Sequence, residues 1–65
     1  MNLNKLKKLG WNIYPNMLIK EQEYPYCKSI VSLEKGKIKR VYWACVGAPV
    51  KVKEKFLEEL KECES

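Results

Sequence analysis

The sequence predicts an α+β fold in the order α-β-β-β-α, built on a three-stranded antiparallel sheet. Apolar residues recur at helical spacing near the C-terminus, and residues 38–46 are rich in β-branched and aromatic side chains. Glu34-Lys35-Gly36-Lys37, between two apolar stretches, is typical of a β-hairpin turn. We expect residues 1–65 to form one domain, with a long C-terminal helix on one face of the sheet and a short N-terminal helix beside it.

The N-terminal segment predicts a short helix from Leu3 to Leu9, capped by Asn2. Its leucines at positions 3, 6 and 9 fall on one side, which we expect to face the core. Gly10 can take the left-handed conformation that ends a helix, and Trp11 is then placed to pack back onto it. Because two helical turns are unstable alone, this helix must pack on the body of the domain.

Three strands are predicted after a turn at Tyr14-Pro15-Asn16, over residues 17–22, 27–33 and 38–46, with Tyr24-Pro25-Tyr26 separating the first two. A three-residue hairpin loop would place Leu33 opposite Lys37 and Val31 opposite Lys39. A two-residue loop would instead bring Ile38 and Tyr42 to the side of Val31 and Leu33, which separates apolar from polar residues less well. The three-residue loop gives an apolar face of Cys27, Val31, Leu33, Val41, Trp43 and Cys45, and a basic, aromatic face of Tyr26, Lys28, Ile30, Ile38, Arg40 and Tyr42.

The C-terminal helix is predicted to open at Pro49, where the missing N–H costs nothing. Its charges run against the helix dipole, because lysines fill the first turns and glutamates the last ones. Because this charge order is locally unfavourable, the lysines are candidates for a function, such as contact with a phosphate backbone. The face that packs on the sheet is predicted to be Val52, Phe56, Leu60 and Cys63, with Leu57 at its edge.

The residue types argue against catalysis and against a bound cofactor. The chain contains no histidine, aspartate or threonine, and it lacks the glycine-rich phosphate-binding motifs. Its cysteines, Cys27, Cys45 and Cys63, are odd in number and form no C-x-x-C pair, so we expect small buried hydrophobes and no metal site. The longest mostly apolar run, residues 41–50, is far shorter than the roughly 20 residues of a membrane span, and the N-terminal residues alternate polar and apolar without the apolar core of a signal peptide. We therefore expect a cytoplasmic protein without membrane contact.

Positive charge is concentrated in the first three-quarters of the chain. The net charge is +5, and residues 1–48 carry nine basic and three acidic side chains, whereas residues 49–65 carry four and five. We therefore expect a nucleic-acid-binding protein that contacts DNA or RNA mainly through the backbone. Of the 13 basic residues only Arg40 is an arginine, which favours weak sequence specificity. The predicted contacts are Lys28, Arg40, Tyr42, Lys51, Lys53 and Lys55, with Tyr26 stacking on a base.

The alternative is a protein-binding module, such as a small inhibitor or accessory protein of the phage or plasmid type. The same basic and aromatic face would dock on an acidic protein, with Tyr26, Tyr42 and Trp11 as anchors. A homodimer is a further option beside the monomer, because a thin core gains from burying more surface and the first predicted strand leaves a free edge.

The order of elements resembles that of two families of nucleic-acid-binding domains. Lys51-Val52-Lys53-Glu54-Lys55 stands where a compact double-stranded-RNA-binding domain has its basic helix start. The first helix is shorter than in that family, and no histidine-bearing loop lies between the first two strands. A three-stranded sheet followed by a helix is also similar to the arm-binding domains of tyrosine recombinases, which place the sheet in the major groove. Both resemblances cover roughly residues 16–62 and imply nucleic-acid binding by analogy of fold alone.

Overall fold

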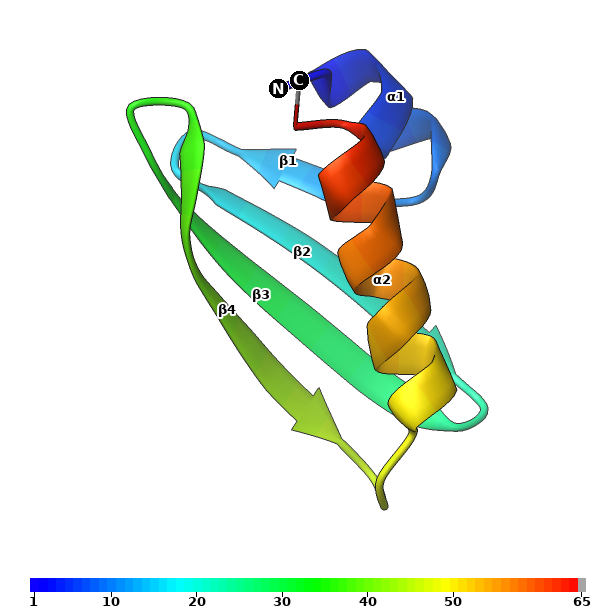
Figure 1. Cartoon of the computed structure of the whole chain (residues 1–65). Coiled ribbons are helices and arrows are strands. Elements are labelled where there is room, and N and C mark those ends of the chain that lie inside the picture. The colour runs from blue at the N-terminus through cyan, green and yellow to red at the C-terminus, as the bar shows by residue number, and fades with distance from the viewer. Residues whose placement is uncertain (65) are drawn as a thin grey trace.

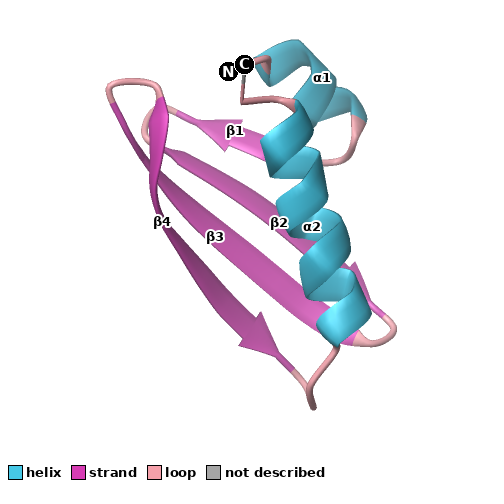
Figure 2. Cartoon of the chain, in the orientation of Figure 1, coloured by secondary structure: helices cyan, strands magenta, loops and turns pink. Residues whose placement is uncertain are grey.

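A computed structural model describes residues 1–64 of the chain, and an antiparallel sheet is its centre. The strands follow one another in the order β1-β2-β3-β4, so each hairpin joins spatial neighbours. Helix α2 crosses one face of the sheet with α1 beside its C-terminal end, and neither helix covers the opposite face (Figure 1; Figure 2). The elements are α1 (Leu3–Lys8), β1 (Asn12–Tyr14), β2 (Met17–Glu23), β3 (Tyr26–Glu34), β4 (Lys37–Cys45) and α2 (Val50–Glu62).

The α+β class is confirmed, but the predicted three-stranded sheet is wrong, because β1 adds a fourth strand. β1 is only three residues long and pairs with β2 through Asn12 opposite Ile19 and Tyr14 opposite Met17. A strand this short shows no alternation that a sequence pattern can detect. The turn predicted around Pro15 is present, and it joins these two strands.

The register of the β3–β4 hairpin differs from the predicted one. The loop has two residues, Lys35 and Gly36, with positive φ angles of 54° and 76°, so Glu34 pairs with Lys37. A bulge at Lys39 then adds one residue to β4, because Leu33 pairs with Ile38 but Ser32 pairs with Arg40.

This combination of loop and bulge moves Ile38 to the helix-covered face. The prediction that Ile38 shares a face with Arg40 and Tyr42 is therefore wrong, and Ile38 packs against the core instead. Beyond the bulge, β4 is displaced by two residues from the predicted register, with Val31 opposite Val41. A displacement of two keeps every side chain on its face, so the rest of the predicted apolar face is preserved.

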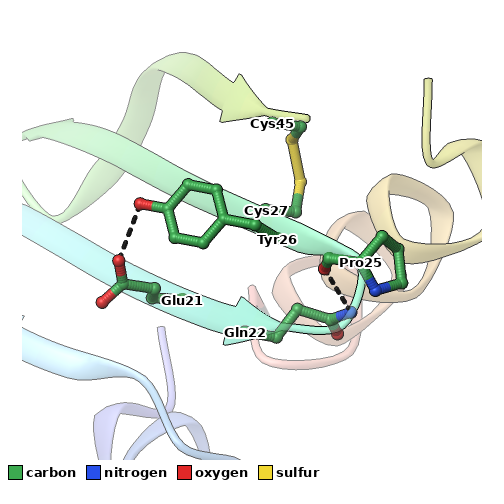
Figure 3. The surroundings of a disulfide bond; sticks show 6 residues. All are labelled: Glu21, Gln22, Pro25, Tyr26, Cys27 and Cys45. Carbon is green, nitrogen blue, oxygen red and sulfur yellow. Dashed lines mark hydrogen bonds between the residues drawn. A yellow bond between two sulfur atoms is a disulfide. The ribbon is translucent and has the colours of Figure 1, made fainter. Parts of the chain in front are cut away.

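The same register joins two of the three cysteines. Cys27 lies directly opposite Cys45, their Cα atoms are 4.0 Å apart, and the two form a disulfide at the ends of β3 and β4 (Figure 3). The prediction that all three cysteines are unlinked hydrophobes is wrong for this pair. Cys63 is a free thiol and is fully buried, as predicted.

The hydrophobic core lies between the sheet and α2. Phe56 is its centre, with its ring centroid 5.8 Å from that of Trp11 and 6.2 Å from that of Trp43. The predicted Asn2 cap is present, with its Oδ1 accepting a hydrogen bond from the Lys5 N–H at 3.0 Å. The predicted helix face is also confirmed, and the buried cluster consists of Leu6, Trp11, Leu18, Val31, Phe56, Leu60 and Cys63.

A buried ion pair crosses this core between β2 and α2. Lys20 Nζ lies 2.6 Å from Glu59 Oε1, and the same ammonium donates to the carbonyl oxygen of Leu9 at 2.8 Å. Trp11 Nε1 donates to that carboxylate oxygen at 3.0 Å. One hydrogen-bonded cluster therefore ties the end of α1, β2 and α2 together. Over residues 1–64, no helix is both long and apolar enough to cross a bilayer.

Candidate functional site

The helix-free face of the sheet, called the open face below, presents side chains from all four strands. The alternation of strand residues assigns every second one to it, and the pairing aligns these residues in rows across the sheet. It consists of Asn12 and Tyr14 from β1, Met17, Ile19, Glu21 and Glu23 from β2, Tyr26, Lys28, Ile30, Ser32 and Glu34 from β3, and Lys37, Arg40, Tyr42 and Ala44 from β4.

The middle of the open face is apolar. Ile19, Ile30 and Tyr42 are directly opposed in successive strands and form one continuous row across β2, β3 and β4. Tyr14 and Met17 form the adjoining row and are 47% and 37% exposed, and Tyr42 is 49% exposed. We call these five residues the apolar row. A contiguous exposed patch of this kind is more informative than scattered exposed hydrophobic residues.

The charges on the open face are mixed. Lys28 and Arg40 lie on it, as the hairpin analysis predicted, but Glu21 and Glu23 of β2 lie on it too. The pair Glu34 and Lys37 at the hairpin end adds one charge of each sign. Three basic and three acidic side chains give the face no net charge, so the predicted basic character holds for β3 and β4 only. Sequence reasoning missed this contribution because it placed no β2 residue on a face.

Tyr26 is tied to β2 by a hydrogen bond across the open face. Its hydroxyl donates to Glu21 Oε2 at 2.7 Å (Figure 3). This hydrogen bond is the main reason that the pKa of Tyr26 is raised above its ordinary value, with partial burial and the negative charge of Glu21 adding to it. Gln22 Nε2 donates to the Pro25 carbonyl at 3.0 Å and closes the adjoining turn. The ring of Tyr26 is thus held along the sheet beside a carboxylate.

The structure divides the seven predicted contact residues into two groups. Tyr26, Lys28, Arg40 and Tyr42 share the open face, whereas the helix lysines belong to α2, on the opposite side of the sheet (Figure 1). The ammonium of Lys53 lies 5.8 Å from the ring centroid of Trp43, which faces the helix. Lys51 and Lys55 are exposed. The first turn of α2, which contains Lys51, has no acidic side chain and no side-chain cap, whereas Lys55 lies one turn later, directly after Glu54.

The chain matches no protein-family model, and comparisons with curated proteins and with solved structures find no match. Its surface chemistry is therefore the basis for assigning a function.

Trp11 does not belong to any exposed surface. It is 2% exposed, packs against Phe56 and donates its indole N–H to Glu59. The prediction that Trp11 could anchor a partner is therefore wrong, whereas its predicted role in holding the first helix is confirmed by the hydrogen bond from its backbone N–H to the Leu6 carbonyl at 3.0 Å. Tyr42, which is also a predicted anchor, is exposed on the open face, and Tyr14 is a second exposed aromatic residue there.

Proposed function

We propose that this protein is a binding module, not an enzyme, and that its open face docks on another protein. The observation that carries the proposal is the apolar row, in which Ile19, Ile30 and Tyr42 continue from strand to strand on a face that neither helix covers. Large aromatic and aliphatic side chains at the centre of a patch, with charges around them, are the usual anatomy of a protein interface.

The charges around the apolar row define the chemistry of the partner. Lys28 and Arg40 lie on the β3–β4 half of the open face, and Glu21 and Glu23 lie on the β2 strand. A partner whose apolar surface is bordered by carboxylates would meet Lys28 and Arg40 with opposite charge. The net charge of +5 would also accelerate encounter with an acidic protein.

The size of the open face limits the affinity. It offers about 15 side chains, fewer than the roughly 20–30 that each partner contributes to a standard interface. We therefore expect a transient complex with a Kd on the order of micromolar, which weakens as salt screens the charged rim.

Nucleic-acid binding is the second candidate, and the exposed Lys51 and Lys55 favour it. Lys51 lies in the first turn of α2, which has no acidic side chain, and a phosphate there would find an ammonium group beside free backbone N–H groups. Lys55 lies one turn later and adds a second positive charge. Against it, these lysines lie across the sheet from Tyr42, and the open face carries as many acidic as basic side chains. A phosphate chain cannot contact both groups without passing around an edge of the molecule.

Photo-crosslinking tests the protein-binding proposal directly. A benzoylphenylalanine in place of Tyr42 should give a covalent adduct with a protein in cells of the source organism. The same group in place of Tyr24, which is 92% exposed in the β2–β3 turn, is the matched control. Excess unlabelled protein should suppress the adduct at position 42, whereas excess Ile30→Lys protein should not. Equal labelling from both positions would contradict docking through the open face.

Fluorescence anisotropy with labelled single- and double-stranded DNA and RNA tests the second candidate. Backbone contact predicts micromolar binding at low salt that weakens about tenfold or more at physiological salt. Lys51→Glu with Lys55→Glu should abolish it, and Tyr42→Ala should leave it unchanged. If instead the wild type binds no nucleic acid even at low salt, the helix lysines have no such role.

A further inference from the structure

We propose that two copies of this chain associate edge to edge through β4, which extends the sheet to eight strands. β4 ends the sheet and is nine residues long, so among residues 1–64 of the monomer one side of it carries no pairing partner. The other edge belongs to β1, which is three residues long. An unpaired edge of this length is a template for another strand, and proteins commonly protect such edges.

The protection of this edge is confined to one end. Lys37, Lys39 and Arg40 place positive charges on the first half of β4, and the bulge at Lys39 interrupts its regular geometry. Both devices discourage pairing. The second half, residues 41–45, carries no charge and no bulge. Regular pairing is therefore available to this segment alone, and its centre is Trp43.

The backbone of this segment has the correct donors and acceptors on its outer side. The Val46 N–H donates to the Tyr26 carbonyl, and hydrogen-bonded pairs alternate along an antiparallel ladder. The backbone N–H and C=O groups of residues 42 and 44 consequently point to β3, and those of Val41, Trp43 and Cys45 point away from it. In a symmetric antiparallel pair, Trp43 would exchange both hydrogen bonds with Trp43 of the second copy, and Val41 would face Cys45.

The helix layer also leaves this side of the molecule incomplete. Trp43 and Val41 are only partly buried under α2. Lys53 lies over Trp43, so the flank of α2 that contains Lys53 faces β4. Val50 lies three residues before Lys53 and Leu57 lies four residues after it, so all three share that flank of the helix. Val50 is 59% exposed and Leu57 is 45% exposed.

A second copy would cover these apolar side chains. A two-fold axis normal to the sheet would keep the α2 helices of the two copies on the same face of the joined sheet. The two β4 strands would lie between the two β3 strands, so the β3 strands would be three strand spacings of about 4.8 Å apart. Trp43 of each copy would then lie side by side between the two helices, flanked by Leu57. The second copy is favoured over a foreign strand because the uncharged segment is self-complementary about Trp43 and requires no opposite charge.

Concentration dependence of the molar mass tests the dimer. Sedimentation equilibrium of the unmodified chain should show a rise from 7.7 kDa to twice that mass between micromolar and millimolar protein. Hydrogen exchange by NMR should show the amides of Val41 and Trp43 becoming protected over the same range. A chain that stays monomeric at millimolar concentration overturns the proposal.

Backbone N-methylation locates the interface, and a chain of 65 residues is accessible to chemical synthesis. N-methylation of Trp43 blocks an outward amide while leaving every side chain and the β3–β4 ladder unchanged, so dimerisation should weaken at least tenfold. N-methylation of Ile13 in β1 is the matched control at the other edge and should have no effect on dimerisation. Circular dichroism of dilute samples verifies that both variants fold. Equal dimerisation of the folded Trp43 variant and the wild type also overturns the proposal. The photo-crosslink from position 42 tests docking through the open face, so its outcome does not depend on whether β4 dimerises.

Discussion

Lys20 Nζ and Glu59 Oε1 lie 2.6 Å apart beneath α2, with side chains that are 12% and 11% exposed. The pair joins the second strand of the sheet to the helix that covers it, across 39 residues of sequence. Trp11 shares the same carboxylate oxygen, which connects the N-terminal helix to both. The position of α2 on the sheet is thus set by a polar contact as well as by the packing of Phe56.

Removing one member of this pair should be strongly destabilising. Glu59→Gln leaves the Lys20 ammonium buried without a counter-charge, which typically costs about 3 kcal/mol or more. Replacing both, as Lys20→Met with Glu59→Leu, should recover most of that loss because no buried charge remains. Urea unfolding monitored by circular dichroism measures both effects.

The control for this prediction is the exposed pair Lys5–Glu62, whose charged atoms are 3.8 Å apart. Its loss, as Glu62→Gln, should change the unfolding free energy by no more than about 0.5 kcal/mol. Similar effects at Glu59 and Glu62 would contradict the structural role of the buried pair.

The disulfide between Cys27 and Cys45 predicts the reactivity of the thiols. Under denaturing, non-reducing conditions, iodoacetamide should alkylate Cys63 alone, and after reduction it should alkylate all three cysteines. Mass spectrometry counts the adducts. Closing a loop with a sequence separation of 18 stabilises a fold by about 3 kcal/mol, so reduction should lower the free energy of unfolding by a similar amount. Three adducts without reductant would show that the bond is absent.

The Tyr26–Glu21 hydrogen bond predicts a pH dependence at alkaline pH. The bond and the adjacent carboxylate favour the neutral phenol, so Tyr26 should titrate above the ordinary pKa of 10.0. Because the folded-state pKa is the higher one, the stabilisation is fully present below pH 10.0 and is lost as the pH rises through the folded-state value. NMR titration should show the pKa returning toward its ordinary value in Glu21→Ala. An unchanged titration in that variant would exclude Glu21 as the cause.

The hairpin turn predicts a stabilising substitution. Lys35 has a φ of 54°, a left-handed conformation that costs a lysine more than it costs asparagine or glycine. Asparagine followed by glycine is the preferred pair for such a two-residue turn, so Lys35→Asn should raise the free energy of unfolding by about 0.5–1 kcal/mol. Lys37→Asn, in the adjoining strand, is the matched control and should give no gain. Thermal unfolding of the two variants distinguishes them.

The confirmed predictions concern features that depend on residues close together in the sequence. The apolar spacing of Val52, Phe56 and Leu60 identified the buried face of α2, and Asn2 marked the start of α1, because caps and helical faces depend on residues within a few positions of each other. The alternation from Val41 to Cys45 likewise kept its faces, since a shift by two residues leaves side-chain direction unchanged.

The features that sequence reasoning missed depend on pairs that are distant in the chain. Cys27 and Cys45 meet only because a two-residue loop and a bulge at Lys39 together displace β4 by two positions, and neither is readable from local composition. Glu59 stands among glutamates at the end of a helix, and only the position of Lys20 on β2 shows that it is buried.

The sequence by itself thus determined the α+β class, the starts of both helices and the apolar faces apart from Ile38, because these follow from local periodicity and capping. Tertiary structure decided the fourth strand, the disulfide, the buried ion pair and the mixed charge of the open face. Each of these arises when strands pair and layers pack. The free energy of such contacts depends on how segments distant in the sequence are placed relative to one another, which cannot be inferred from local sequence patterns.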